Sequence, residues 1–149
     1  MTLSIRPARV EERGALGALK LRSSLAWGDH VEELQAIPEA REVPAAHLPY
    51  VAVADRSGQI FGFVTVLPGD TADRAELEDL FVAPEAWRMG IGSLLLAEAE
   101  RRAKALGTQA LEVVADERAR PFYEASGFRF DGTVQTDLAP AIRLRKDIS

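Results

Sequence analysis

The sequence contains no cysteine and only two histidines among its 149 residues. Without cysteine there is no disulfide, no thiolate metal site and no cysteine nucleophile. His30 and His47 alone are too few for a histidine-rich metal site, so we expect no metal cofactor. The lack of cysteine also fits a reducing compartment, although it does not require one.

An excess of basic residues is also missing. The chain carries 18 lysines and arginines against 23 aspartates and glutamates, which gives a formal net charge of −5. Domains that bind nucleic acid or an anionic membrane surface are usually basic. We therefore expect no nucleic acid and no membrane as partner, and a small neutral or cationic molecule instead.

Long apolar segments are absent as well. The longest apolar run falls far short of the ~20 residues that a membrane-spanning helix needs. Residues 1–6 lack a basic segment followed by an apolar one, which is the pattern of a secretory signal. These features predict a cytoplasmic protein.

What is present is the composition of an ordinary globular protein, with 47% hydrophobic and 28% charged residues. A chain of this length can bury a substantial core, and we expect residues 1–149 to form a single domain.

Apolar spacing and turn residues predict the secondary structure. Alternating or β-branched segments predict strands over residues 2–6, 50–54, 60–67, 76–82, 110–115, 127–130 and 142–145. Apolar residues at steps of three and four predict helices over 10–25, 29–37, 90–106 and 118–126, with Asp29 and Asp116 as candidate N-caps. Residues 39–49 contain two prolines and are expected to form a loop. The strand–helix–strand unit over 76–114 should be parallel. Antiparallel pairing elsewhere predicts a mixed sheet with helices on its faces.

A pair of glycines opens the clearest helix. Gly90 and Gly92 follow a strand that ends near Val82 and a short loop. The first N–H groups of a helix lack internal partners and lie at the positive end of the helix dipole. Glycines there let a phosphate group approach the backbone closely, and Arg88 and Ser93 add a charge and a hydroxyl. The alternative is that the small residues only let the helix pack against the sheet.

Two known phosphate loops fit this turn poorly. A Walker loop needs a lysine before its Ser or Thr, but Ser93 follows Gly92 directly. A dinucleotide-binding fingerprint needs a third glycine, and that position holds Leu95. An enzyme that uses ATP or NAD is therefore a less favoured interpretation.

The turn resembles the signature of the GNAT superfamily of acyl-CoA-dependent N-acyltransferases. That signature is Gln/Arg-x-x-Gly-x-Gly/Ala at the head of a long helix, and residues 87–92 read Trp-Arg-Met-Gly-Ile-Gly. Both glycines match, whereas Trp87 stands at the Gln/Arg position. A second family pattern, Asn-x-x-Ala-x-x-Phe/Leu-Tyr-x-x-x-Gly-Phe, matches residues 116–128 except that Asp116 replaces the Asn. Because residues 5–8 also resemble the family's first strand, the resemblance spans nearly the whole chain.

The resemblance implies a mixed α/β (α+β) fold, with a mostly antiparallel, twisted sheet and helices on both faces. In the family, the fourth and fifth strands splay apart and the pantetheine arm of acetyl-CoA inserts between them. The implied cofactor contacts are the backbone of Leu80, Phe81 and Val82 for that arm, the turn Arg88, Met89, Gly90, Ile91, Gly92 and Ser93 for the pyrophosphate, and Asp116.

For the reaction, the resemblance implies direct attack by a neutral amine on the thioester of acetyl-CoA. The family's acid is often a tyrosine at the position of Tyr123, whose phenol keeps its proton at neutral pH and can protonate the departing thiolate. Alternatively, Tyr123 is a core aromatic. The fourth-strand glutamate of histone-acetylating members corresponds to Glu78, the candidate base; a solvent-facing carboxylate or a water chain are the alternatives. Leu111 stands where other members carry a fifth-strand base.

We therefore expect an acetyl-CoA-dependent N-acetyltransferase that acts on a primary amine of a small molecule or peptide. The acceptor pocket is expected near Trp27, His30 and Tyr50. The acids at 70, 73, 76 and 79 either attract a cationic amine or form a solvated rim. Dimers are common in the family, so a homodimer is one expected state.

The alternative function is a non-catalytic acyl-CoA-binding or sensor module, which would need the glycine turn but not Tyr123. For the enzyme, the absence of cysteine excludes a cysteinyl acyl-enzyme. This favours direct transfer in a ternary complex with sequential kinetics.

Overall fold

The computed structural model describes residues 2–136 and 140–148. The strands within them are β1 (Ser4–Pro7), β2 (Val51–Arg56), β3 (Gln59–Pro68), β4 (Arg74–Val82), β5 (Ala110–Ala115), β6 (Arg129–Val134) and β7 (Ala141–Asp147). They are hydrogen bonded in the order β1-β2-β3-β4-β5-β7-β6. All seven predicted strands are therefore confirmed, with boundaries shifted by a few residues.

Two compact units make up the chain. The first comprises the residues up to Thr65 together with Asp79–Glu98. The second comprises Val66–Glu78 and the residues from Ala99 onward. The strands β3 and β4 and the helix α3 (Ile91–Ala105) each run from one unit into the other.

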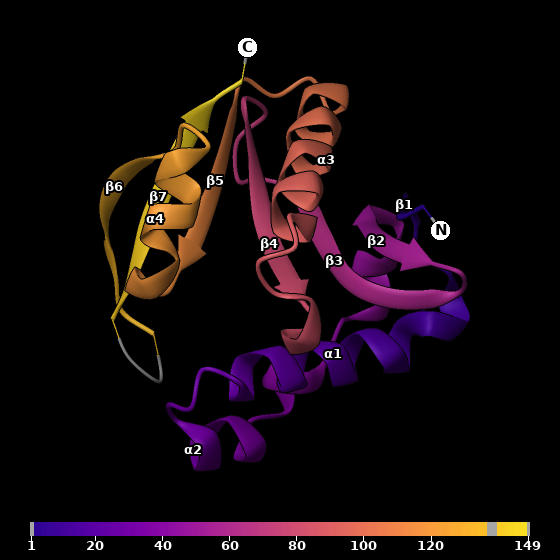
Figure 1. Ribbon diagram of the computed structural model, residues 1–149. Coiled ribbons are helices and arrows are strands. Elements are labelled where there is room, and N and C mark those ends of the chain that lie inside the picture. Colours follow the sequence, from indigo (N-terminus) through magenta and orange to yellow (C-terminus); the bar gives the residue numbers. More distant parts are fainter. Residues whose placement is uncertain (1, 137–139, 149) are drawn as a thin grey trace. The chain divides into compact units, whose positions relative to one another are not determined.

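In the first unit, β1, β2 and the first part of β3 pair antiparallel (Figure 1). Residues 51–54 of β2 are fully buried, so both faces of this strand are covered. The β2–β3 turn has positive φ at Ser57 (55°) and Gly58 (87°), and the Asp55 carboxylate accepts a hydrogen bond from the Gly58 N–H at 2.7 Å. These are features of a tight hairpin, which joins the strands predicted over residues 50–54 and 60–67.

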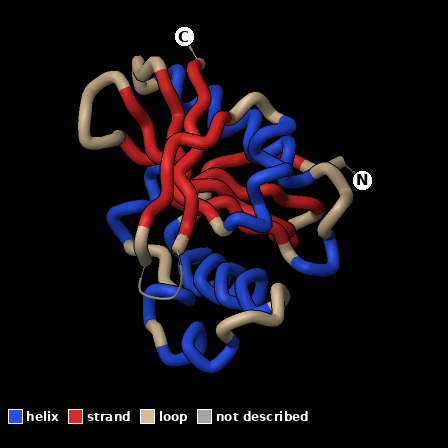
Figure 2. Tube along the Cα trace, turned by 90° about the vertical axis from the view of Figure 1, so that its left-hand side faces the viewer, coloured by secondary structure: helices blue, strands red, loops and turns tan. Residues whose placement is uncertain are grey.

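The first unit also contains most of the helical segments. They are η1 (Val10–Glu12), α1 (Arg13–Leu25), α2 (Val31–Ala36), η2 (Pro38–Arg41), η3 (Ala45–Tyr50) and η4 (Pro84–Ala86). α1 and α2 lie side by side (Figures 1 and 2). α1 also lies against η2, so closely that a Cβ on Gly17 would overlap the Arg41 carbonyl.

Two predictions in this region are wrong. Residues 39–49 were expected to form a loop, but most of them lie in η2 and η3, because prolines preset the backbone φ that a short 3₁₀ turn needs. The second helix was expected to be capped by Asp29. It instead starts after His30, which adopts a left-handed φ of 55° and makes no side-chain cap.

In the second unit, β5, β7 and β6 pair antiparallel, as predicted for the two final strands (Figure 1). The predicted helix over 118–126 is divided into η5 (Glu117–Ala119) and α4 (Arg120–Ala125). The Arg120 guanidinium of α4 lies 4.7 Å from the centre of the Phe130 ring on β6. On β7, Lys146 forms an ion pair with Glu100 of α3 at 2.8 Å.

β4 and β5 are parallel, as predicted for the strand–helix–strand unit. Their register pairs Arg74–Leu77 with Ala110–Val113. The five remaining residues of β4, Glu78–Val82, follow this paired stretch. No helix among the described residues is long and apolar enough to span a membrane.

Candidate active site

The glycine turn lies in the first unit, between β4 and α3. Two of its residues have left-handed backbone conformations, Arg88 with φ 65° and Gly90 with φ 82°. The Gly90 carbonyl accepts the first helical hydrogen bond of α3, from the Leu94 N–H at 3.2 Å. The N–H groups of the three residues in between therefore have no partner inside the helix.

The structure also shows why Gly90 is glycine. A Cβ at this position would have no atom within 4 Å, so close packing against the sheet does not require the glycine. Its positive φ does, because L side chains rarely adopt that conformation. Arg88, Met89 and Ser93 are exposed, so the turn presents a cation, a hydroxyl and unpaired helix N–H groups to solvent. This arrangement suits an anionic phosphate.

The carbonyl of Val82, at the end of β4, accepts two side-chain hydrogen bonds. The Ser23 hydroxyl of α1 donates to it at 2.8 Å, and the Trp87 indole N–H also donates to it at 2.8 Å. A backbone carbonyl has two lone pairs, so both acceptor positions are used. A cofactor that contacts Val82 would therefore have to use its N–H group or its side chain.

A buried carboxylate lies three residues earlier on β4. Asp79 is only 4% exposed and lies 3.5 Å from the Lys20 ammonium of α1, which also donates to the Glu42 carbonyl at 3.1 Å. The interpretation of Asp79 as part of a solvated acidic rim is therefore wrong, because burial of an aspartate requires a partner such as this lysine.

Tyr123 lies in α4 of the second unit and is 5% exposed. Its ring meets Phe122 and Phe128 edge to face, with centroids 5.0 and 5.4 Å away. Burial raises the pKa of its phenol above the ordinary value of 10.0, so the hydroxyl keeps its proton at neutral pH. Within the described part of the chain this hydroxyl donates no hydrogen bond. Tyr123 is thus a buried aromatic residue whose hydroxyl is protonated.

A charged cluster occupies one side of the β4–β5–β7 region of the second unit. Glu76 and Glu112 are opposite each other in the parallel register. Glu112 is nearly fully buried and binds Arg74 at 2.8 Å and Arg143 at 3.1 Å. Arg143 also lies 3.9 Å from Glu76. Burial, and secondarily the negative charge of Glu112, raise the pKa of Glu76 above 4.5.

The predicted base, Glu78, is exposed on β4. Glu76, two residues earlier, was predicted only to attract a cationic amine or to belong to a solvated rim, yet its environment is the one that makes a carboxylate a better proton acceptor. The signal that would have distinguished the two is the register with Glu112, which a single sequence does not contain.

Asp116 caps η5, as predicted, and binds Arg118. Its carboxylate accepts from the Arg118 backbone N–H at 2.8 Å and from the Arg118 guanidinium at 3.0 Å. The departure from the family's Asn is thus accompanied by an adjacent arginine that neutralises the new charge.

The residues expected to line the acceptor pocket differ in their surroundings. Trp27 is 49% exposed and its ring lies 5.2 Å from that of Trp87 in the same unit. His30 is bound to Glu33 at 2.9 Å, and Tyr50 is half-buried at the end of η3.

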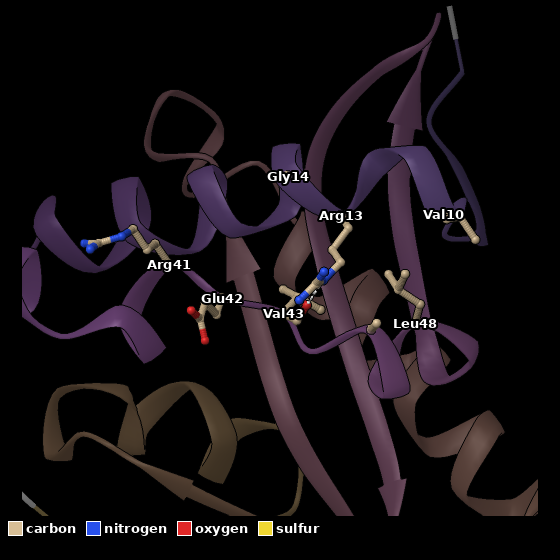
Figure 3. Close-up of a pocket in the computed structure, with 8 residues that line it drawn as sticks. Val10, Arg13, Gly14, Arg41, Glu42, Val43 and Leu48 are labelled. Atoms are coloured by element: carbon tan, nitrogen blue, oxygen red, sulfur yellow. Dashed lines mark hydrogen bonds between the residues drawn. The ribbon is translucent and has the colours of Figure 1, made fainter.

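A separate groove of about 440 Å³ lies in the first unit, between the start of α1 and residues 41–48 (Figure 3). The Arg13 guanidinium reaches across it to the Val43 carbonyl at 2.6 Å. None of the predicted catalytic or cofactor-binding residues lines this groove.

Comparison with known proteins identifies the family. The profile described as "Acetyltransferase (GNAT) family" matches residues 19–128, which is well over half of the chain. The chain therefore belongs to the GNAT acetyltransferase family, as its two motifs indicated.

Several relatives are informative. An amino-acid acetyltransferase of Azotobacter vinelandii is 31% identical over 137 residues, which cover 92% of this chain and 30% of the relative. YhfO of Bacillus subtilis, an uncharacterized N-acetyltransferase, is 26% identical over 87% of this chain and 91% of its own length. The chain spans less than a third of the length of the amino-acid acetyltransferases it matches.

Among solved structures, the PaiA N-acetyltransferase from Thermoplasma acidophilum in complex with coenzyme A superposes with a TM-score of 0.77. It is 21% identical, and 99% of each chain is covered. This likeness confirms the expected fold, a mixed and mostly antiparallel sheet surrounded by helices.

Proposed function

We propose that the protein is an acetyl-CoA-dependent N-acetyltransferase that acylates a primary amine of a small molecule or peptide. The observation that carries this proposal is the turn at residues 88–93. Its positive φ angles, unpaired helix N–H groups and exposed cation suit a diphosphate, and it belongs to a chain of the GNAT family.

The residues of the turn and of the β4 end fit the donor. We assign the pyrophosphate to Arg88–Ser93, the pantetheine arm to Leu80–Val82, and a supporting contact to Asp116. The short β4–β5 register supports this assignment, because Leu80–Val82 lie beyond the four paired residues of β4. Bound acetyl-CoA supplies the acetyl group as a thioester, which an amine nitrogen attacks at the carbonyl carbon as the carbon–sulfur bond breaks.

In this proposal Tyr123 is the general acid. Its raised pKa keeps the proton on the phenol, and its hydroxyl is free to donate that proton to the leaving sulfur. A non-catalytic acyl-CoA-binding module would have no use for this hydroxyl. The protonated hydroxyl of Tyr123 therefore supports the enzyme over the binding module.

The amine must lose a proton before or during attack, and we assign this task to a carboxylate of β4. The family resemblance assigns it to Glu78. The surroundings favour Glu76, because burial and the charge of Glu112 raise its pKa and a raised pKa makes a carboxylate a stronger base.

Glutamine variants distinguish the two residues. Because the base must be ionised, kcat/KM of the wild type should fall as pH drops through a pKa above 4.5. We expect Glu76→Gln to abolish this acidic limb and to lower kcat/KM at neutral pH by ~10²-fold. The pH–rate profile of each variant checks this. If Glu78→Gln shows these changes and Glu76→Gln does not, Glu78 is the base. If neither variant alters the profile, neither glutamate is the base and water accepts the proton.

Direct transfer predicts sequential kinetics. Since the chain has no cysteine, no cysteinyl acyl-enzyme can form, and donor and acceptor must be bound together. Double-reciprocal plots of initial rate against acetyl-CoA at several amine concentrations should intersect. Parallel lines would indicate an acyl-enzyme and contradict the proposal.

The ligand class can be tested apart from turnover. Coenzyme A and acetyl-CoA should raise the thermal midpoint of the protein, whereas ATP and NAD should not, because a ligand that binds the folded state stabilises it. Stabilisation by ATP or NAD alone would favour the nucleotide-dependent interpretation instead.

We also propose a cytoplasmic location, supported by the cysteine-free sequence, and a homodimer as the assembly to be tested. For the acceptor, the proposal specifies a primary amine and no particular compound. The amino-acid acetyltransferases to which the chain is similar make amino acids the first compounds to try.

A further inference from the structure

One face of α1 is joined to the end of β4 and to the turn that follows it, all within the first unit. Three side chains, spaced three and four residues apart, make the contacts. The pairs are Lys20 with Asp79, Ser23 with Val82, and Trp27 with Trp87. Beside them, Arg22 and Glu85 form an ion pair at 2.6 Å.

Trp87 is fixed from two directions. Its indole N–H donates to the Val82 carbonyl at 2.8 Å, and its ring lies 5.2 Å from that of Trp27 with the planes tilted by 37°. The next residue, Arg88, has a φ of 65°, which non-glycine residues seldom adopt. Such a conformation persists only where the surrounding structure enforces it, and the fixed ring of Trp87 is the adjacent restraint.

We propose that Trp27 and Trp87 are positioning residues, whose contacting rings hold the turn at residues 87–90 in the shape that receives the diphosphate of the donor. This inference rests on the proposed function, because it assumes that the turn binds coenzyme A. It also explains how the chain accommodates a tryptophan where the family signature has Gln or Arg. In this chain the Trp87 indole N–H donates to the Val82 carbonyl, and the ring of Trp27 on α1 lies against the Trp87 ring.

Replacing Trp27, which lies outside the turn, tests the positioning role directly. We expect Trp27→Ala to weaken coenzyme A binding by about two- to twelve-fold, the value of one aromatic pair, measured as Kd by isothermal titration calorimetry. Because Trp27 acts through Trp87, the KM for acetyl-CoA should rise by about the same factor as the Kd. Trp27→Phe keeps an aromatic ring and should recover most of the affinity. Trp87→Phe keeps the ring but loses the indole N–H, and should weaken binding by a similar factor.

A matched control is Phe130→Ala in the second unit. Phe130 is 44% exposed and stacks with Arg120, so its truncation also removes an exposed aromatic contact. It should leave the Kd for coenzyme A unchanged. Thermal midpoints of all variants show whether each one is folded at the assay temperature.

The two tryptophans of the chain are this pair, so fluorescence excited where only tryptophan absorbs reports on it alone. Emission should change as coenzyme A is added, and should still change in Trp27→Phe, where Trp87 is the remaining reporter. If the wild type binds no coenzyme A, the proposed function fails. If it binds and Trp27→Ala binds equally well, or Trp27→Phe shows no recovery, the positioning role is overturned while the proposed function stands.

Discussion

Replacing Tyr123 with phenylalanine should lower turnover by ~10²-fold or more while leaving the Kd for coenzyme A unchanged. The substitution removes only the hydroxyl, and the ring contacts with Phe122 and Phe128 are kept. A departing thiolate without a proton donor is a poorer leaving group, so the loss should fall on kcat. Steady-state rates of thiol release together with calorimetric Kd values separate the two effects.

The pH dependence provides a second readout for the same residue. Burial raises the pKa of the Tyr123 phenol above 10.0, so the proton remains available as the pH rises through the range in which an ordinary tyrosine would lose it. The wild-type rate should therefore show no alkaline fall attributable to Tyr123 up to about pH 10. Unchanged turnover in Tyr123→Phe would remove the residue from the mechanism and revive the binding-module interpretation.

Replacing Gly90 with valine should weaken coenzyme A binding by at least about ten-fold. The φ of 82° is unfavourable for a β-branched residue, at a cost of about 1–2 kcal/mol, so the turn is expected to relax toward another shape. The new side chain would also fill the open space beside the backbone where the phosphate must approach. The change in Kd can be measured by calorimetry at a temperature where the variant is folded.

Gly107 offers a matched control for the strain alone. It has a φ of 81°, its Cβ would also meet open space, and it follows the other end of α3. Gly107→Val should therefore lower the thermal midpoint about as much as Gly90→Val and leave coenzyme A binding intact. Equal loss of affinity in both variants would mean that Gly90 supports the fold and not the site.

Local signals were sufficient for much of the fold. The hairpin between β2 and β3 follows from Asp55–Gly58, because the turn chemistry is contained in four consecutive residues. The helix α3 follows from its apolar spacing and the glycines at both ends. The start of α2 could not be predicted, since His30 adopts a left-handed conformation that is uncommon for any residue other than glycine.

For the site, the sequence motifs identified the turn and Tyr123, but not their surroundings. The paired carboxylates of Glu76 and Glu112 depend on the register between two strands separated by a helix. The Val82 carbonyl accepts hydrogen bonds from Ser23 and Trp87, and the first of these requires α1 to pack against β4. Such contacts are fixed by tertiary packing, and no spacing within one segment encodes them.

The most direct test of the proposed activity is to incubate the wild-type protein with acetyl-CoA and a panel of primary amines, including amino acids. Release of free coenzyme A and acetylation of the amine are measured together. We predict amine-dependent release of the thiol, with one acetylated amine formed per coenzyme A. Coenzyme A binding without acetylation of any amine in the panel would contradict the enzymatic function and leave the protein as a binding module.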